Sequence, residues 1–353
     1  MDSLTQACLG AAVGASLLGR PLGRKALLLG AALGTLPDLD VVIDYGDAVA
    51  DYTYHRGFSH SLWVLAALAT ILALASAGFA RRHGISLRRW WLTLGACLLS
   101  HPLLDAFTTY GTQLWWPLTS PPTAWASVFI IDPLYTLPLI VALGIGLVRG
   151  GASRAPCWGL ALSGAYLLFT LGAKFIVDER IAPTLAERDL AEAPRLVQPT
   201  PFNSLLWRVT VVEDGYYHES LVGLFDERAP RLTRFPRGAA LEPAARATAA
   251  GQRLHWFAGP FLAYQIAPRD GRETLIATDL RLGFPGYHPF RFTLAERVEG
   301  DWQAVDSRLV PGASAGAGAL RQLARRIVSE RIPLCQETSP NADPVGMIDC
   351  PER

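Results

Sequence analysis

The sequence predicts an α-helical multi-pass membrane domain of about six spans, followed by a soluble α+β domain. Half of the 353 residues are hydrophobic and only 18% are charged, a composition that is too apolar for an ordinary soluble protein. The apolar residues gather in residues 1–177, whereas the rest of the chain is rich in Arg, Glu, Asp and Pro. These two regions therefore predict one domain surrounded by lipid and one surrounded by water.

Successive apolar blocks fill the first region, and they are 4–19, 26–43, 60–80, 90–106, 127–148 and 158–177. A helix needs about 20 residues, or roughly 17–25, to cross a bilayer. All blocks but the first qualify by length; block 4–19 is marginal, because its glycines fit either a tightly packed span or a half-helix that enters the membrane and stops. Core helices of a large soluble protein would show more amphipathic alternation, so we expect membrane spans.

Basic residues mark alternate loops between these blocks. They are Arg20, Arg24 and Lys25 after the first block, Arg81, Arg82, Arg88 and Arg89 after the third, and Arg149 and Arg154 after the fifth. The positive-inside rule places such loops in the cytoplasm. The other ends of the blocks and the soluble domain are then expected on the outer side of the membrane.

Polar clusters lie at the ends of the blocks that are expected to meet at this outer face. Their ionisable members are Asp38, Asp40, His55, Arg56, His60, His101 and Asp105. The spacing of His101 and Asp105 puts both side chains on one helical face, close enough to chelate one ion. His55 and His60 are too far apart for one face of a straight helix, so at least one is expected in the loop before block 60–80. Taken alone, each pair also fits a polar helix end or an anchor at the membrane interface.

Imidazole and carboxylate ligands without thiolate suit zinc, iron, manganese or nickel, and zinc is the commonest choice for hydrolysis. We therefore predict a divalent metal, zinc or alternatively manganese, bound as one or two ions. The expected ligands are Asp40, His55, His60, His101 and Asp105. Asp38 and Asp40 are expected to point to opposite sides, so that one binds metal and the other supports a ligand or acts as the general base. Arg56 is expected to stabilise the charge that develops in the reaction.

The same residues carry a family resemblance. The segments Met1–Gln6, Leu36–Asp40, His55–Ser61 and Ser100–Asp105, followed by Gly111 and Trp116-Pro117, resemble the YdjM family of predicted membrane-bound metal-dependent hydrolases. The resemblance covers roughly residues 1–145, and its most specific element is His55–Ser61. It implies a bacterial inner-membrane protein. Some members carry a histidine where this chain has Gln6, so the chain departs from the family at one expected ligand.

The second region is expected to be periplasmic. Residues 178–201, which end in a Pro-rich stretch, predict a linker, and residues 202–332 predict an α+β domain. Two apolar runs around Asp214-Gly215 predict a β-hairpin. Further strands are expected at 253–267, 273–282 and 290–298, and helices near 240–250 and 317–331.

The remaining histidines and the cysteines are expected to have structural roles. We predict sheet-surface positions for His218, His255 and His288. Cys8, Cys97 and Cys157 lie in or beside apolar spans and are expected to be inert. Cys335 and Cys350 lie in the C-terminal tail, residues 333–353, and are expected to form a disulfide there, because the predicted topology places the tail in an oxidising compartment.

These observations predict a membrane-bound metal-dependent hydrolase whose site lies at the periplasmic membrane face. Membrane lipids are expected partners, and a phosphoester or lipid-linked substrate suits a site in this position. The alternative is a non-enzymatic membrane scaffold or envelope factor with a structural metal site. A transporter would carry its ionisable groups near the bilayer midplane, which this pattern disfavours. The net charge of +1 gives no reason to expect a nucleic-acid partner.

Overall fold

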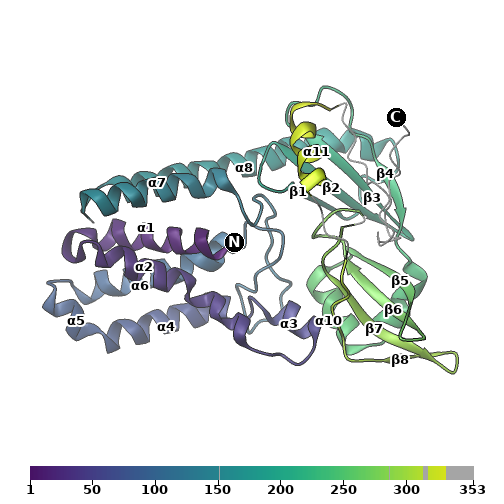
Figure 1. Ribbon diagram of the computed structural model, residues 1–353, viewed down its shortest axis with the longest axis horizontal. Coiled ribbons are helices and arrows are strands. Elements are labelled where there is room, and N and C mark those ends of the chain that lie inside the picture. The colour runs from purple at the N-terminus through teal and green to yellow at the C-terminus, as the bar shows by residue number, and fades with distance from the viewer. Residues whose placement is uncertain (151, 286, 313–316, 331–353) are drawn as a thin grey trace. The chain divides into compact units, whose positions relative to one another are not determined.

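The computed structural model describes residues 1–150, 152–285, 287–312 and 317–330, and its helices and strands are labelled in Figure 1. The chain divides into two compact units. The helical unit comprises Met1–Ile43, Tyr54–Gly172 and Pro201–Ser204, and the β unit comprises Asp44–Thr53, Ala173–Thr200 and the described residues from Leu205 onward. The expected Cys335–Cys350 disulfide lies outside the described residues.

The helical unit is built from helices joined by short 3-10 segments. Its elements are α1 (Ser3–Leu22), α2 (Lys25–Thr35), η1 (Leu36–Val42), η2 (Phe58–His60), α4 (Leu62–Ala75), α5 (Ala77–Arg82), α6 (Leu87–Asp105), α7 (Pro133–Arg149) and the first part of α8 (Ala155–Ala186). The largest core cluster of the unit includes Leu18, Leu65 and Leu98, from α1, α4 and α6. These helices support η1, η2 and the end of α6, which carry the polar clusters.

Helices α1 and α2 pack with their backbones in contact. A methyl group on Gly14 would lie 2.6 Å from the Ala26 carbonyl oxygen, and one on Gly34 would lie 2.7 Å from the Gln6 carbonyl oxygen. Gly10 and Gly30 face each other in the same way, because a methyl group on either would overlap the backbone of the other. Small residues at four successive contact points therefore fix the separation and the register of the two helices.

The expectation of about six membrane spans is wrong. Within the described part of the chain, one helix, α8, is long and apolar enough to cross a membrane. A second candidate is the pair Ala48–His60 and Leu62–Ala75, which is bent by 47°. The expected block 26–43 stops being α-helical where α2 gives way to η1, and α7 begins only at Pro133. The 3-10 segment η1 thus ends α2 after 11 residues, too few to span, whereas α1 and α6, with 20 and 19 residues, are long enough but not apolar enough.

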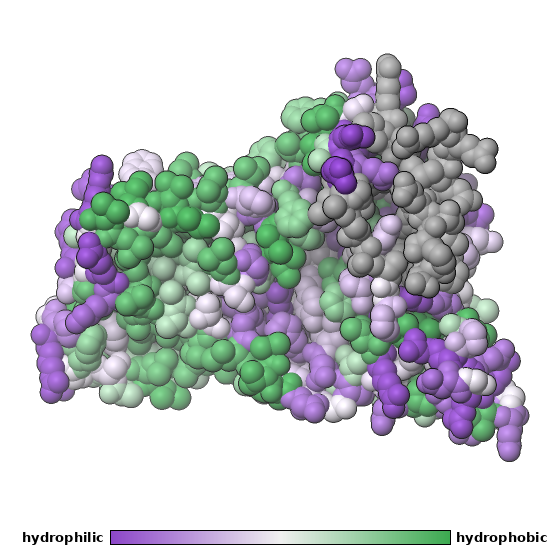
Figure 2. Space-filling view, viewed as in Figure 1, coloured by the Kyte–Doolittle hydropathy of each residue, from purple (hydrophilic) through white to green (hydrophobic). Residues whose placement is uncertain are grey.

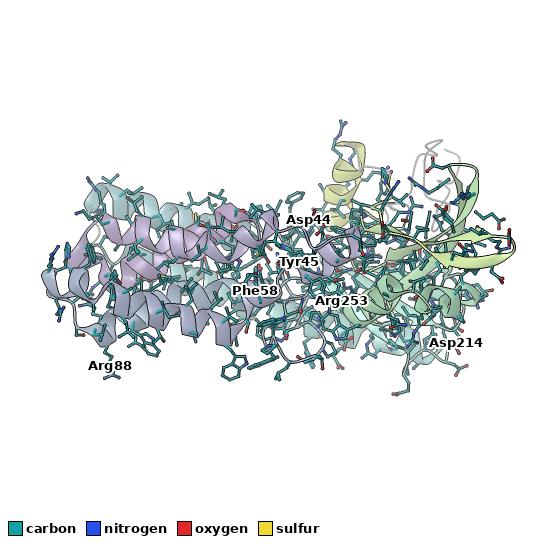
Figure 3. All side chains as sticks on the ribbon, turned by 90° about the horizontal axis from the view of Figure 1, so that it is seen from below. Asp44, Tyr45, Phe58, Arg88, Asp214 and Arg253 are labelled. Atoms are coloured by element: carbon teal, nitrogen blue, oxygen red, sulfur yellow. The ribbon has the colours of Figure 1, made fainter. Side chains whose placement is uncertain are left out.

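Large apolar side chains nevertheless cover the outside of the helical unit (Figure 2). They include Leu28, Ile71, Leu74, Leu137, Val141, Leu162 and Leu168, each more than half exposed. An apolar surface of this extent indicates contact with another molecule or with lipid rather than with water. Arg88 and Phe58 lie at opposite ends of this unit (Figure 3), so the basic loop at Arg81–Arg89 is remote from the polar clusters.

The β unit contains two four-stranded antiparallel sheets, each with its strands in sequence order. The first sheet contains β1 (Arg195–Pro199), β2 (Leu206–Glu213), β3 (Tyr216–Gly223) and β4 (Thr233–Pro236), and the second contains β5 (Leu262–Arg269), β6 (Arg272–Asp279), β7 (Arg291–Val298) and β8 (Asp301–Ala304). The second part of α8 packs Val177, Ile181 and Leu185 against the first sheet. Other helices of the unit are η3 (Ala239–Leu241), α9 (Glu242–Arg246), α10 (Ala249–Ala258) and α11 (Ala317–Val328).

Residues Asp44–Thr53, which include most of α3 (Ala48–Tyr54), are an insertion from the N-terminal region into the β unit. The Tyr52 ring packs against Phe257 and Phe290, with ring centroids 5.1 and 4.5 Å away. Its hydroxyl donates a hydrogen bond of 3.0 Å to Asp279 Oδ2. The segment between the Asp38–Asp40 cluster and the His55–His60 cluster is therefore anchored in the core of the β unit.

The expected helical region followed by a strand-rich region is present, and so is the hairpin at Asp214-Gly215, where Glu213 pairs with Tyr216. The strands expected at 273–282 and 290–298 correspond to β6 and β7. The strand expected at 253–267 is wrong in its first part, because α10 continues to Ala258. The expected linker contributes residues to α8 and β1. His288, expected on a sheet surface, is fully buried.

The contact between α1 and α2 gives a first prediction. Gly30→Ala is expected to lower the free energy of unfolding by about 1–3 kcal/mol, the usual cost of overpacking, because the added methyl group overlaps the backbone of α1. Thermal unfolding of the detergent-purified protein measures the change. Gly164→Ala is the matched control, since Gly164 is also helical but has open space around it. Equal melting temperatures for the two variants would contradict the close packing.

Burial of His288 gives a second prediction. Desolvation, aided by the charge of Arg208, lowers the pKa of His288 to about 3. In the unfolded chain the pKa of histidine is about 6.5, so between these values the unfolded state binds one more proton than the folded state. The free energy of unfolding should then fall as the pH drops below about 6.5, by up to about 1.4 kcal/mol per pH unit.

Chemical denaturation followed by circular dichroism at several pH values measures this loss. His288→Asn removes the titrating group and should make the pH dependence shallower. The same pH dependence in both proteins would show that His288 does not cause it.

Candidate metal centre

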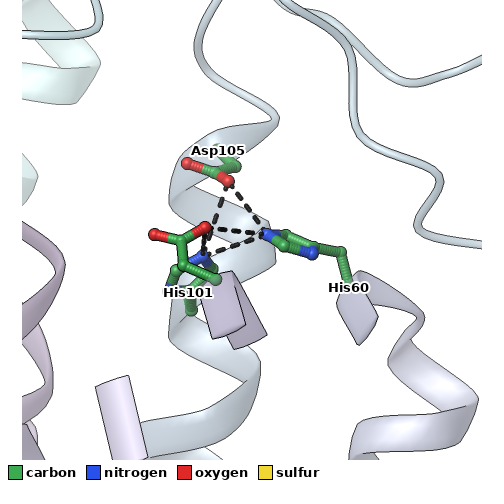
Figure 4. A group of neighbouring side chains, drawn as sticks. His60, His101 and Asp105 are labelled. Atoms are coloured by element: carbon green, nitrogen blue, oxygen red, sulfur yellow. Dashed lines mark hydrogen bonds and ion pairs between the residues drawn. The ribbon is translucent and has the colours of Figure 1, made fainter. Parts of the chain in front are cut away.

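Four side chains of the helical unit converge on one point. They are Asp38 from η1, His60 from η2, and His101 and Asp105 from α6, and one potential ligand atom of each lies within 4.8 Å of those of the others. Figure 4 shows the two imidazoles and the Asp105 carboxylate directed toward one another. His60, His101 and Asp105 are fully buried, and the side chain of Asp38 is 21% exposed.

The distances between these atoms match a tetrahedral metal site. His60 Nε2 and His101 Nε2 are 3.1 Å apart, and Asp38 Oδ1 lies 3.4 and 3.2 Å from them. Asp105 Oδ2 lies 3.4 Å from His60 Nε2 and 3.6 Å from His101 Nε2. Ligand atoms bound at about 2.0–2.1 Å to a tetrahedral zinc ion are spaced about 3.3 Å apart. Five of the six separations therefore lie near the spacing that one such ion requires, and the sixth, between the two carboxylate oxygens, is within 4.8 Å.

Hydrogen bonds at the opposite ring nitrogens orient both imidazoles. His101 Nδ1 lies 2.6 Å from the Gly34 carbonyl oxygen, which can only accept, so Nδ1 carries the proton. Ser59 Oγ donates to Asp40 Oδ2 at 2.7 Å and must accept from His60 Nδ1 at 2.8 Å. Both Nε2 atoms then present lone pairs toward the centre. Support of this kind at the remote nitrogen is typical of histidines that bind metal.

Asp105 is held by groups from two other parts of the unit. Its Oδ1 accepts a hydrogen bond of 2.9 Å from Gln6 Nε2 and another from the Met1 amino group. Its Oδ2, the atom directed to the centre, is buried and has no hydrogen-bond partner among the described residues. Burial opposes ionisation, but the charges of Arg56 and the Met1 amino group, with smaller contributions from the two imidazoles, together outweigh it and keep the pKa of Asp105 well below its usual range. A buried, ionised and unsatisfied oxygen at this position suits a cation.

Asp38 contacts the centre from η1. Its partial burial favours the protonated form, but the neighbouring imidazoles of His101 and His60 outweigh this effect and lower the pKa of Asp38. The carboxylate is therefore ionised at neutral pH. Its Oδ1 is the fourth potential ligand atom of the group, beside two imidazole nitrogens and one oxygen of Asp105.

Arg56 lies beside Asp105 in an unusual backbone conformation. Its φ of 61° is in the left-handed region, which costs a non-glycine residue of order 1 kcal/mol. The conformation is held by the Arg56 N–H donating to Asp40 Oδ2 at 3.1 Å and by the Arg56 carbonyl accepting from Gln113 N–H at 3.0 Å. Arg56 Nε lies 3.1 Å from Asp105 Oδ2 without hydrogen-bond geometry, and Nη1 donates to Thr108 Oγ1 at 3.3 Å. The guanidinium thus lies at the edge of the centre.

Asp40 and His55, which the sequence suggests as ligands, lie next to the four-residue group and outside it. Asp40 Oδ1 and His55 Nδ1 are 3.0 Å apart, and His55 is 27% exposed. Asp40 Oδ2 accepts from Ser59 Oγ and from the Arg56 backbone. Partial burial opposes ionisation of Asp40, but hydrogen bonds from His55 and Ser59 outweigh it and lower its pKa. Asp40 therefore connects three neighbouring residues that surround the centre.

Two groups that orient the histidines could not be predicted from the spacing of residues along the sequence. Gly34 contributes a backbone carbonyl, which no side-chain pattern reveals, and Ser59 contributes a hydroxyl, whereas the nearby Ser61 caps α4. The sequence gives a weak indication that Gln6 belongs to the site, because some members of the family that the chain resembles carry a histidine at this position. Its amide donates to the His101 carbonyl oxygen at 3.2 Å as well as to Asp105. Asp132 is buried at the N-cap of α7 and accepts from Tyr166, away from the group.

A model of a known protein family matches the part of the chain that contains the polar clusters. The family model of the YdjM inner membrane protein matches residues 1–177, half of the chain and all four residues of the group. The chain belongs to the YdjM inner membrane protein family. This YdjM family member is 36% identical over 115 residues to the inner membrane protein YbcI of Escherichia coli (strain K12).

The YbcI match covers 32% of the present chain and 64% of the relative, so the chain spans less than two thirds of that protein. No solved structure matches the YdjM family member. The family supports a location in the membrane, and the geometry supports a group that can hold a metal ion.

The orientation of His60 gives a third prediction. Ser59→Ala removes the acceptor of the His60 Nδ1 proton and is expected to weaken metal binding by about 10–100-fold, as loss of a group that supports a ligand usually does. Competition with a chelator measures the dissociation constant. Ser100→Ala is the matched control, because Ser100 Oγ donates to the Cys97 carbonyl of its own helix and, among the described residues, to no group of the centre. Unchanged affinity in Ser59→Ala would refute the orienting role.

Proposed function

We propose that this YdjM family protein is a membrane-bound metal-dependent hydrolase. The observation that carries the proposal is the convergence of the four ligand atoms within 4.8 Å of one another, with both carboxylate oxygens 3.2–3.6 Å from the imidazole nitrogens. Asp38, His60, His101 and Asp105 would hold the ion, and zinc is the best match to two imidazoles and two carboxylates. Manganese is the alternative. Asp40 and His55 would support the site rather than bind the ion.

A divalent ion in this position would supply Lewis acidity and would lower the pKa of water, the usual basis of metal-assisted hydrolysis. The residues of the chain would do the rest. Arg56 would bind an anionic oxygen of the substrate at the edge of the centre, since its guanidinium is buried and already oriented by Thr108 and Asp105. Asp40 would hold His60 and Arg56 in place through Ser59 and the Arg56 backbone.

A phosphoester or another lipid-linked ester is the proposed substrate class. The family is one of inner membrane proteins, so membrane lipids would be at hand. The exposed face of η1 supports this class, because Leu39, Val41 and Val42 are 59%, 73% and 81% exposed in the segment that carries Asp38. An apolar segment beside a polar centre suits a substrate with a charged head and an apolar tail. The proposed location of the site and of the β unit is the periplasmic side.

A second candidate function is a membrane scaffold with a structural metal. It is favoured by one feature, the presence of four protein ligands, because structural zinc sites are fully coordinated by protein whereas catalytic sites keep an open position. The two functions differ in what loss of the metal does. A structural ion contributes mainly to folding, and a catalytic ion contributes mainly to turnover.

The fourth prediction separates these functions. Detergent-purified protein should contain about one equivalent of zinc or manganese by elemental analysis, and His101→Ala should contain none, because it removes a buried ligand. His83→Ala is the control, since His83 lies on the basic side of the helical unit and outside the group. Hydrolysis of p-nitrophenyl phosphoesters and of phospholipids in mixed micelles should then follow the metal content.

Metal-free wild-type protein that gains no metal on reconstitution would refute both functions. Bound metal without hydrolysis of either class of ester, together with a lower melting temperature of His101→Ala, would support the scaffold and reject the hydrolase.

A further inference from the structure

Three of the four residues that surround the centre are anchored by groups outside it. His101 donates to the Gly34 carbonyl, and His60 donates to Ser59. Asp105 accepts from Gln6 and from the Met1 amino group. All three side chains are fully buried. These anchors hold the three ligand atoms in place whether or not the fourth is present.

Asp38 lacks any such anchor. Within the described residues, its carboxylate contacts only the two imidazoles of the centre, at 3.4 and 3.2 Å from Oδ1. Its side chain is 21% exposed, whereas the other three are inaccessible to solvent. Asp38 is thus the one member of the group that can leave without breaking a contact elsewhere and without opening the core.

The backbone that carries Asp38 is also irregular. Asp38 lies on η1, a 3-10 helix of seven residues that continues directly from α2. Runs of 3-10 helix longer than 3–4 residues are uncommon, and they frequently mark hinges or strain. On the outer face of η1, Leu39 and Val41 are 59% and 73% exposed, so little of the described chain packs against this face, whereas Pro37 and Asp40 hold the inner face.

We propose that Asp38 is the exchangeable ligand of the centre, and that an oxyanion of the phosphate class takes its place. This inference rests on the proposed metal-dependent function. In the exchange, the bond between the metal and Asp38 Oδ1 breaks and a bond between the metal and an oxyanion oxygen forms, while the oxidation state of the metal stays the same. His60, His101 and Asp105 remain as a set of two imidazoles and one carboxylate, the composition of an open catalytic zinc site.

The exchange reconciles the four-ligand geometry with a catalytic role. With Asp38 bound, the centre is closed to solvent on its one accessible side. With Asp38 displaced, the oxyanion enters beside Arg56, whose guanidinium borders Asp105. A second oxygen of the oxyanion is then within reach of a cationic donor, as bidentate recognition of phosphate requires.

Cobalt(II) is the probe for the test, because its visible absorption reports the number and type of its ligands. The full-length protein in detergent is loaded with one equivalent of cobalt. Three matched substitutions are compared with the wild type: Asp38→Asn, Asp105→Asn, and the control Asp44→Asn, an exposed carboxylate outside the group. Cobalt affinity is measured by chelator competition, and inorganic phosphate is titrated into each cobalt protein with no free metal present.

We expect Asp38→Asn to keep one cobalt, with affinity reduced by no more than about tenfold, and Asp105→Asn to lose cobalt by more than about 100-fold. Phosphate should change the wild-type spectrum and should do so at a concentration at least about tenfold lower in Asp38→Asn, because no carboxylate competes with it. Asp44→Asn should behave as the wild type.

Loss of cobalt from Asp38→Asn to the same extent as from Asp105→Asn would overturn the inference, as would a wild-type spectrum that phosphate leaves unchanged. In either case cobalt bound to the wild type would leave the metal centre itself intact. A wild type that binds no cobalt would instead refute the metal centre and the exchange together.

Discussion

The candidate centre depends on the close contact between α1 and α2. Because glycines at Gly10, Gly14 and Gly30 let the two backbones touch, the end of α2 lies close enough to α6 for the Gly34 carbonyl to accept from His101 Nδ1. The same contact brings Gln6 of α1 to Asp105. A side chain at any of these glycines would separate the helices and displace supports of both α6 ligands. The packing of the apolar helices and the chemistry of the polar centre therefore share one constraint.

On the other side of the centre, Asp40 holds the neighbouring groups in place. One carboxylate accepts hydrogen bonds from the Arg56 backbone, from Ser59 Oγ and from His55. A buried carboxylate is costly to desolvate unless such donors surround it. Through Ser59 it fixes His60, and through the backbone it stabilises the left-handed conformation of Arg56. Removal of this single charge would loosen two functional groups that do not contact each other directly.

Much of the centre could be predicted from the sequence, because helical spacing relates His101 to Asp105 and the polar clusters mark the ends of apolar blocks. Which of Asp38 and Asp40 faces the centre could not be predicted, since this depends on the turn of η1 and not on alternation along an extended chain. The number of spans was overestimated for a related reason: hydropathy reports which residues avoid water, but it does not report where a helix ends. The Asp214-Gly215 hairpin was predictable because its turn residues act locally.

The insertion of Asp44–Thr53 into the β unit has a consequence for how the chain can be divided. The segment connects η1 to the His55–His60 cluster, and its Tyr52 and Thr53 bond to Asp279 and Arg253, residues that come 200 positions or more later in the chain. No single cut can therefore release the helical unit as an independent fragment. A fragment that ends near residue 177 would keep the segment Asp44–Thr53 but lack the part of the β unit that buries it. During synthesis, Asp44–Thr53 and the ligands on both sides of it emerge before the β strands. The segment can therefore reach its folded position only after those strands have been made. The two units of this protein are thus separate in architecture but not in their assembly.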